Sequence, residues 1–462
     1  MKRLLLSSLL GLIGTVYAAD FRLPAYETSK LPNGLTIQLM ERHEVPLIAV
    51  RAVVKAGSVW DGKQAGLANL TAEALLLGSQ RYGKKALEEA FDFRGANIGS
   101  VSGAEQAILT ADFARDDTAA LLPILAEVLQ HPSFDAGELN KLRARSVDGL
   151  KQAKESPRNV VQSYYRSMLF GEGAYGNPAE GTVGSVGALK RADVQAFHQR
   201  YYRPDNATLV VVGDFKAAEL RQQLEKLFGN WQAKGEAPKE LAYGTVRADK
   251  ARVWLINKPD SVETTFMFGG AGIARNDPDY IPLQVVNTIL GGRFTSWLND
   301  ELRVNSGLTY GARSEFSSLS QTGTFLVSSF TALDKTEAAL ALASKTYQRL
   351  WDKGIDEATL ESAKAYVKGQ YPPRFETNEQ LAGLLGDMFA YRLERAQLDS
   401  FMQSVDQLTT ASAKQLVEKH FPRDKLQMVL IGKAETIRPI AAKYGEVTEL
   451  DIKADGFAPL VR

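Results

Sequence analysis

One pattern of residues occurs twice in the chain, about 220 residues apart, and this repeat constrains the fold more than any other feature. Residues 202–208 predict a turn that runs into the apolar stretch Leu209–Val212. Residues 421–427 predict a similar turn before Met428–Ile431. Solenoid repeats are much shorter than this interval, so the pattern indicates tandem duplication of a whole domain.

Within each half, the expected strands and helices mix without a regular strand–helix–strand alternation. An Asn33-Gly34 turn opens a strand that reaches Leu39, and Ala49–Lys55 is a second predicted strand. The predicted helices are Gly66–Leu77, Asp117–Gln130, Ala136–Lys154, Arg158–Met168, Ala217–Phe228 and Ala434–Tyr444. This order predicts an α+β fold of two homologous domains, each a mainly antiparallel sheet packed with helices.

The N-terminus has the character of a secretory signal. Lys2 and Arg3 precede the apolar core Leu4–Val16, and the small residues Ala18 and Ala19 follow it. The core is short for a membrane span, so we expect cleavage; an uncleaved anchor is the alternative. No later segment is long and apolar enough to predict a stable membrane span. We expect a soluble mature chain, periplasmic if the source is a Gram-negative bacterium.

The domain boundaries are predicted from this signal and from a polar linker. Gln232–Lys239 contains Gly235 and Pro238 and has the composition of a connecting segment. The predicted parts are a signal peptide at 1–19, an N-terminal domain at 20–231, a linker at 232–240 and a C-terminal domain at 241–462.

Composition excludes several kinds of chemistry. The formal net charge is +1 with scattered basic residues, so we expect no nucleic-acid partner. The chain has no cysteine, which excludes disulfides and a thiol nucleophile, and it has no G-x-S-x-G elbow. Its four histidines are His43, His131, His198 and His420. No two of them are within four residues, which excludes a two-histidine zinc site on one helix.

The segment Gly66–Ser79 has the frame of a zinc-peptidase helix without its chemical residues. Such a helix carries two histidines one turn apart that bind zinc, and a glutamate that activates water. Asn69, Ala72 and Glu73 stand at these three positions. A neutral amide is a poor zinc ligand, and Glu73 has no second ligand on the helix. We expect Asn69 and Glu73 to remain as polar groups on a vacated cleft floor.

With these residues, the chain resembles the pitrilysin/insulinase zinc peptidases, the inverzincins, from Leu31 to about Gly432. Further matches to the family pattern are Leu31–Leu35, Gly57, Ser58, Asp61, Tyr202, Pro204, Asn206 and Gly213. The resemblance implies two related α+β domains that enclose a substrate chamber. It places the third zinc ligand of the family, a glutamate, at Gly149. The chain is therefore expected to bind no metal of its own.

The second half retains the other part of the family's active site. Arg303, on a predicted helix, precedes Tyr310 by seven residues, with Gly307 suited to end the helix between them. The resemblance implies that this Arg/Tyr pair binds the substrate backbone and polarises the scissile carbonyl from the domain opposite the zinc. Both side chains are hydrogen-bond donors suited to that task. Taken alone, Arg303 could be a solvated helix charge and Tyr310 a half-buried strand aromatic.

The resemblance also places the family's substrate strand at Gly99, Ser100, Val101 and Ser102, where a peptide could pair with the backbone. Three functions remain open. The first is a non-catalytic subunit that binds peptide substrate and supplies Arg303 and Tyr310 to a zinc-bearing homologous partner, as in split bacterial members of the family. The second is a pseudo-peptidase that binds or scaffolds peptides without hydrolysis. The third, a purely structural subunit, is disfavoured by the secretory signal.

Overall fold

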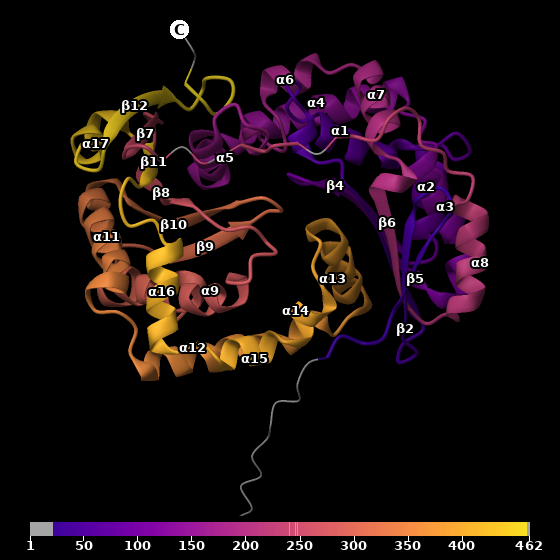
Figure 1. Ribbon diagram of the computed structural model, residues 1–462. Coiled ribbons are helices and arrows are strands. Elements are labelled where there is room, and N and C mark those ends of the chain that lie inside the picture. The colour runs from indigo at the N-terminus through magenta and orange to yellow at the C-terminus, as the bar shows by residue number, and fades with distance from the viewer. Residues whose placement is uncertain (1–21, 240, 245, 247, 460–462) are drawn as a thin grey trace, which may run out of the picture.

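Each half of the chain builds a six-stranded sheet, and the two sheets share the order of five strands (Figure 1). The computed structural model describes residues 22–239, 241–244, 246 and 248–459, so the predicted signal peptide lies outside the described residues. The first sheet has the order β1 (Glu27–Lys30), β2 (Thr36–Glu41), β6 (Ala207–Gly213), β3 (Leu47–Val54), β5 (Ala107–Ala114) and β4 (Asn97–Ser102). The second has the order β12 (Glu446–Asp451), β7 (Arg252–Asn257), β11 (Gln427–Gly432), β8 (Glu263–Ala271), β10 (Gly323–Ala332) and β9 (Ala312–Ser318).

This equivalence confirms the duplication and the α+β class. Antiparallel pairs predominate in both sheets, as predicted. The parallel pairs β2–β6, β7–β11 and β7–β12 make both sheets mixed. The parallel partners within each half are far apart in sequence, which explains why no strand–helix–strand alternation is visible.

Within the described residues, helices occur between the equivalent strands of both halves, eight in the first half and nine in the second. Those of the first half are α1 (Leu67–Ala74), α2 (Lys84–Asp92), α3 (Thr118–Gln130), α4 (Ala136–Ala153), α5 (Pro157–Phe170), α6 (Val183–Ala188), α7 (Arg191–Tyr201) and α8 (Ala217–Phe228). Those of the second are α9 (Tyr280–Asn287), α10 (Trp297–Asn299), α11 (Thr336–Asp352), α12 (Glu357–Gln370), α13 (Asn378–Tyr391), α14 (Arg395–Asp399), α15 (Phe401–Asp406), α16 (Thr410–His420) and α17 (Ala434–Ala441). No helix in the described ranges has the length and apolar character needed to cross a bilayer.

The predicted helices agree with these bounds to within two residues in most cases. The last one is shorter than expected and ends at Ala441. The predicted helix Gly66–Leu77 is divided into α1 and a 3₁₀ turn at Leu75–Leu77.

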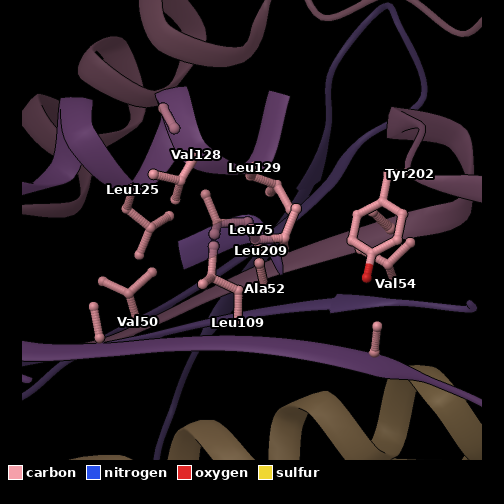
Figure 2. Close-up of a cluster of buried hydrophobic side chains, with 14 of the residues drawn as sticks. Val50, Ala52, Val54, Leu75, Leu109, Leu125, Val128, Leu129, Tyr202 and Leu209 are labelled. Atoms are coloured by element: carbon pink, nitrogen blue, oxygen red, sulfur yellow. The ribbon is translucent and has the colours of Figure 1, made fainter. Parts of the chain in front are cut away.

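One face of the first sheet packs against helices of its own half (Figure 2). The side chains drawn there include Val50, Ala52 and Val54 of β3, Leu109 of β5, Leu209 of β6, and Leu125, Val128 and Leu129 of α3. Residues at alternate positions of a strand share a face, so this core takes every second residue of β3.

The opposite face of each sheet packs against a helix from the other half of the chain. Helix α13 lies on β3 and β6, where Leu381 and Leu385 join a core with Val210 and Val212. Helix α5 lies on β8 and β11 in the equivalent way, with Tyr165 in that core. Both β6 and β11 are buried at every position, which explains their continuous apolar sequences. The two halves thus exchange helices.

The tips of two equivalent hairpins also join the halves. The carboxylate of Glu105, in the β4–β5 turn, accepts a hydrogen bond from the backbone N–H of Ser320 in the β9–β10 turn, at 3.0 Å. It accepts another from the Tyr175 hydroxyl at 2.6 Å. Burial, together with the nearby Glu105 carboxylate, raises the pKa of Tyr175 and keeps this donor protonated.

The helix exchange predicts where a mutation in α13 acts. Leu385 is fully buried, so Leu385→Ala is expected to lower the free energy of unfolding by about 2–5 kcal/mol. Backbone amides of β3 and β6 should lose hydrogen-exchange protection, although these strands are more than 150 residues away in sequence. The exposed Glu379 on the same helix provides the control Glu379→Ala, expected to change stability by less than about 0.5 kcal/mol. Protection lost in the second sheet while the first keeps it would contradict the exchange.

Candidate functional site

Helix α1, which carries the degenerate zinc-site positions, is anchored at its N-terminus by Asp61. The Asp61 carboxylate accepts hydrogen bonds from the backbone N–H groups of Gly66 and Ala68, both at 2.8 Å. These groups have no partner within the helix, and a carboxylate also complements the positive end of the helix dipole. Asp61 is only 4% exposed. Burial raises its pKa to about 7, against the lowering effect of the backbone donors.

Asn69 and Glu73 hydrogen-bond to each other along α1. The Asn69 amide nitrogen donates to a Glu73 carboxylate oxygen at 2.8 Å. The two residues lie one helical turn apart and are half-buried, whereas Ala72 between them is fully buried. The two polar side chains at the degenerate positions of α1 thus form their hydrogen bond within the helix.

The residues at the four degenerate positions do not fit zinc. A catalytic zinc site requires three protein ligands, and Glu73 is the only one of the four with a charged donor. Gly149 is exposed on α4, and a Cβ added there would have no atom within 4 Å, so the position has room but no ligand. Ala72, at the position that the resemblance assigns to the base, offers no carboxylate to activate water.

Strand β4 contains the predicted substrate strand and forms one end of the first sheet, beside α1. Gly99 and Ser102 pair with Thr110 and Ala107 of β5. Within the described residues, no strand pairs with the other side of β4. Val101 is 59% exposed. An unpaired strand edge presents backbone donors and acceptors that can bind an extended chain.

Arg303 and Tyr310 lie in the segment that leads into β9. Arg303 is exposed on a π-helical turn, Asp300–Asn305, that continues α10. Gly307 follows the C-cap residue Ser306 and has the expected left-handed conformation, with a φ of +62°, and Tyr310 lies just before β9. The Tyr310 side chain is 83% exposed, so it is not a half-buried strand aromatic.

Neither side chain has a polar partner in the described part of the chain. The Arg303 guanidinium lies 4.8 Å from the centre of the Phe294 ring and forms no hydrogen bond or ion pair there. The structure therefore leaves the donors of both side chains available to solvent or to another molecule.

Two of the histidines, His198 and His420, make other contacts. His198 is buried, and its ring lies 2.9 Å from the Leu129 carbonyl; burial lowers its pKa to about 4, as expected for a packed histidine. Asp277, Asp279 and His420 offer ligand atoms within 4.8 Å of one another. However, the Lys419 ammonium lies 2.6 Å from the Asp279 carboxylate, so a cation already occupies that oxygen.

Sequence reasoning missed three arginines that share a groove with Arg303. Arg158, Arg293 and Arg313 come from α5, the turn after α9, and β9. More than 130 residues separate Arg158 from the other two, so no sequence motif contains all three. They lie in one groove because α5 packs on the second sheet.

Comparison with known proteins agrees with this geometry. Residues 37–183 match the family model described as insulinase (peptidase family M16), and residues 188–367 match the one described as peptidase M16 inactive domain. The chain belongs to the M16 (insulinase) peptidase family. Its relatives include both zinc proteases and a non-peptidase homologue.

Two relatives illustrate this range. The chain is 24% identical to the non-peptidase homolog YmxG of Helicobacter pylori (strain ATCC 700392 / 26695), over 90% of this chain and 94% of that one. It is 23% identical to the uncharacterized zinc protease YmxG of Bacillus subtilis (strain 168), over 76% of this chain and 85% of that one.

Two solved structures have the same fold. A peptidase M16 inactive domain from Pseudomonas fluorescens superposes with a TM-score of 0.83 and 27% identity, covering 88% of this chain and 98% of that one. A protease from Helicobacter pylori superposes with a TM-score of 0.80 and 18% identity, covering 88% of this chain and all of the other.

The environment of Asp61 predicts a pH dependence of stability. Its pKa is raised in the folded state, so the folded chain keeps a proton that the unfolded chain releases, and Asp61 destabilises the fold as pH rises from about 4 to 7. Asp61→Asn removes this titration. Between pH 5 and pH 8, the free energy of unfolding of the variant minus that of the wild type should rise by roughly 2–3 kcal/mol, at 1.36 kcal/mol per pKa unit.

Denaturant titrations of both proteins across this pH range measure the difference, and effects of other titrating groups cancel in it. The amide has one acceptor oxygen where the carboxylate has two, which lowers the stability of the variant equally at all pH values. A difference that stays constant with pH would show that Asp61 is already ionised at pH 5.

Proposed function

We propose that the chain is a non-catalytic, substrate-binding subunit of a periplasmic zinc metallopeptidase heterodimer. A homologous partner supplies the zinc and the water-activating glutamate. This chain supplies Arg303 and Tyr310, which donate hydrogen bonds to carbonyl oxygens of the peptide in the partner's site. We base the periplasmic location on the predicted N-terminal signal. The same signal predicts cleavage after Ala18 or Ala19.

The observation that carries the proposal is an asymmetry between the two halves. On α1, Asn69 and Glu73 hydrogen-bond to each other, and neither Ala72 of α1 nor Gly149 of α4 has a side-chain atom that could bind a metal. At the start of β9, by contrast, Arg303 and Tyr310 are exposed and without polar partners in the described residues. The positions on α1 and α4 thus lack the side chains of a zinc site, whereas the side chains of Arg303 and Tyr310 are exposed.

The surface around Arg303 has the composition of a protein interface. Phe294 is 64% exposed, Val304 is 63% exposed and Tyr310 is 83% exposed, all within one short segment. Exposed aromatic and arginine side chains carry much of the binding energy at interfaces. A partner that covers this segment would remove apolar surface from water and gain access to the guanidinium and the phenol.

The free edge of β4 favours a second candidate, a pseudo-peptidase that captures peptides without hydrolysis. Its unpaired backbone could hold an extended peptide with no contribution from another subunit. The two candidates differ in their dependence on a partner, because only the first predicts that this chain accelerates cleavage by a zinc-bearing relative.

The decisive substitution is Arg303→Ala, tested in a complex of this chain with its zinc-bearing relative. The variant should lower the kcat/KM for peptide cleavage by about 10²–10³-fold, as expected when a donor to developing negative charge is removed. The exposed Arg145 on α4 provides a matched control, and Arg145→Ala should leave the rate within about twofold of the wild type.

Two further measurements separate the possible causes. Sedimentation of each complex shows whether the variant still assembles, so that a loss of rate can be assigned to the guanidinium rather than to dissociation. If the assembled Arg303→Ala complex cleaves at the wild-type rate, the role proposed for this residue is wrong. If the wild-type chain neither binds nor accelerates any zinc-bearing relative, the pseudo-peptidase becomes the better account.

A further inference from the structure

A groove of about 700 Å³ runs beside Arg303 over the second sheet, and its volume lies within the range of ligand pockets. Side chains of β8, β9 and β10 line it, including Thr265, Ser328 and Phe330. Helix α5, the turn after α9 and Tyr366 of α12 also contribute. We call it the β9–β10 groove. Its lining combines side-chain hydroxyl groups with three aromatic rings, those of Phe294, Phe330 and Tyr366.

The charged residues of the groove are strongly biased to one sign. Four of them are arginines, and the single carboxylate is Glu315. The chain as a whole is nearly neutral, with a formal net charge of +1, so this bias is a local property. Such a concentration of positive charge in a concave site attracts anions.

Only one of the four arginines is neutralised by an ion pair. Arg158 forms a 2.9 Å pair with Glu263 and lies over the Phe330 ring at 3.8 Å from its centre. Arg293, Arg303 and Arg313 have no carboxylate oxygen within 4.0 Å in the described residues. Three of the arginines that line the groove therefore have no ion-pair partner in the described residues.

Neutral contacts hold two of these guanidinium groups in place. Arg313 Nε donates to the hydroxyl of Ser328, which lies opposite on β10, at 3.2 Å. Arg293 Nη1 donates to the hydroxyl of Ser362 at 3.1 Å and to its carbonyl at 3.2 Å, while Arg293 Nε is buried without a partner. Each keeps further N–H groups for a ligand, and a guanidinium that is already oriented loses less entropy on binding.

We propose that the β9–β10 groove binds extended peptides through the carboxylates of their acidic side chains. This inference rests on the proposed function and names its substrate class, because Arg303 is shared between the groove and the partner's site. The planar guanidinium groups match carboxylates by paired hydrogen bonds. Residues two apart in an extended peptide share a face, so alternate acidic residues present their carboxylates to the same side of the groove.

A peptide fits these features better than a nucleic acid. Nucleic-acid-binding surfaces carry basic residues over a large face or along a helix, whereas here they are confined to one groove in a nearly neutral chain. The hydroxyl of Ser328 on the groove wall is also suited to the amide groups of a peptide.

The test uses the wild-type chain without a partner and fluorescence anisotropy of labelled peptides. The first probe is a ten-residue peptide of alternating threonine and glutamate with an amidated C-terminus. Its glutamine and lysine counterparts, and the glutamine peptide with a free C-terminus, are the comparisons. The glutamate peptide should bind at least about tenfold more tightly than the others, since hydrogen bonds to charged groups are among the strongest polar contacts.

Two variants locate the binding. Arg313→Gln and Arg293→Gln should each weaken binding of the glutamate peptide by about tenfold, whereas Arg145→Gln, at an exposed position of α4, should change it by less than about twofold. Thermal unfolding of each variant shows whether the fold is intact. Binding should also weaken as salt concentration rises, because the contacts are electrostatic.

Four results would overturn the inference. They are equal binding of the glutamate and glutamine peptides, glutamate binding that neither groove variant changes, a preference for the free C-terminus over the acidic side chains, and equally tight Arg313-dependent binding of a ten-nucleotide oligothymidylate. Any of these would leave the role of Arg303 in the heterodimer intact, because that role is tested by the cleavage rate of the complex.

Discussion

The exchange of helices α5 and α13 between the halves is the constraint on which the rest of the structure depends. Each central strand is apolar on both faces, and the second face is covered only when the other half of the chain is in place. Because these faces are buried between the halves, α1 and β4 of the first half have a fixed position relative to the Arg303 segment of the second half. The exchange also builds the β9–β10 groove, because α5 contributes Arg158 to a wall that otherwise belongs to the second half.

Under the proposed function the fold is held without a bound metal, and contacts around α1 can account for this. Asp61 caps α1 and Ala72 packs beneath it, so the helix is held by contacts that need no zinc. The Asn69–Glu73 hydrogen bond pairs the polar groups that remain. The surface on the other half is organised differently, since its aromatic and guanidinium groups face outward. The architecture is thus consistent with a chain whose remaining function depends on binding rather than on activating water.

Local features of the fold could be predicted from the sequence, and the long-range contacts could not. Continuous apolar residues predicted buried strands at Leu209–Val212 and Met428–Ile431, and helical periodicity placed four of the six helices whose bounds were predicted to within two residues. The amphipathic pattern of α5 shows that one face is buried but not which sheet covers it. The absence of zinc-binding side chains at positions 69, 72 and 149 could be read from the sequence, because residue type alone determines whether a side chain can bind zinc. Exposure of Tyr310 and the grouping of the groove arginines depend on tertiary packing.

The most direct test of the account is the zinc content of the purified lone chain, measured by mass spectrometry of the metal after equilibration with zinc and gel filtration. We predict substoichiometric zinc, because one charged donor among Asn69, Ala72, Glu73 and Gly149 cannot form a catalytic site. The variant with histidine at 69 and 73 and glutamate at 72 and 149 is the positive control. One tightly bound zinc per wild-type chain, together with chelator-sensitive peptide cleavage, would contradict the account.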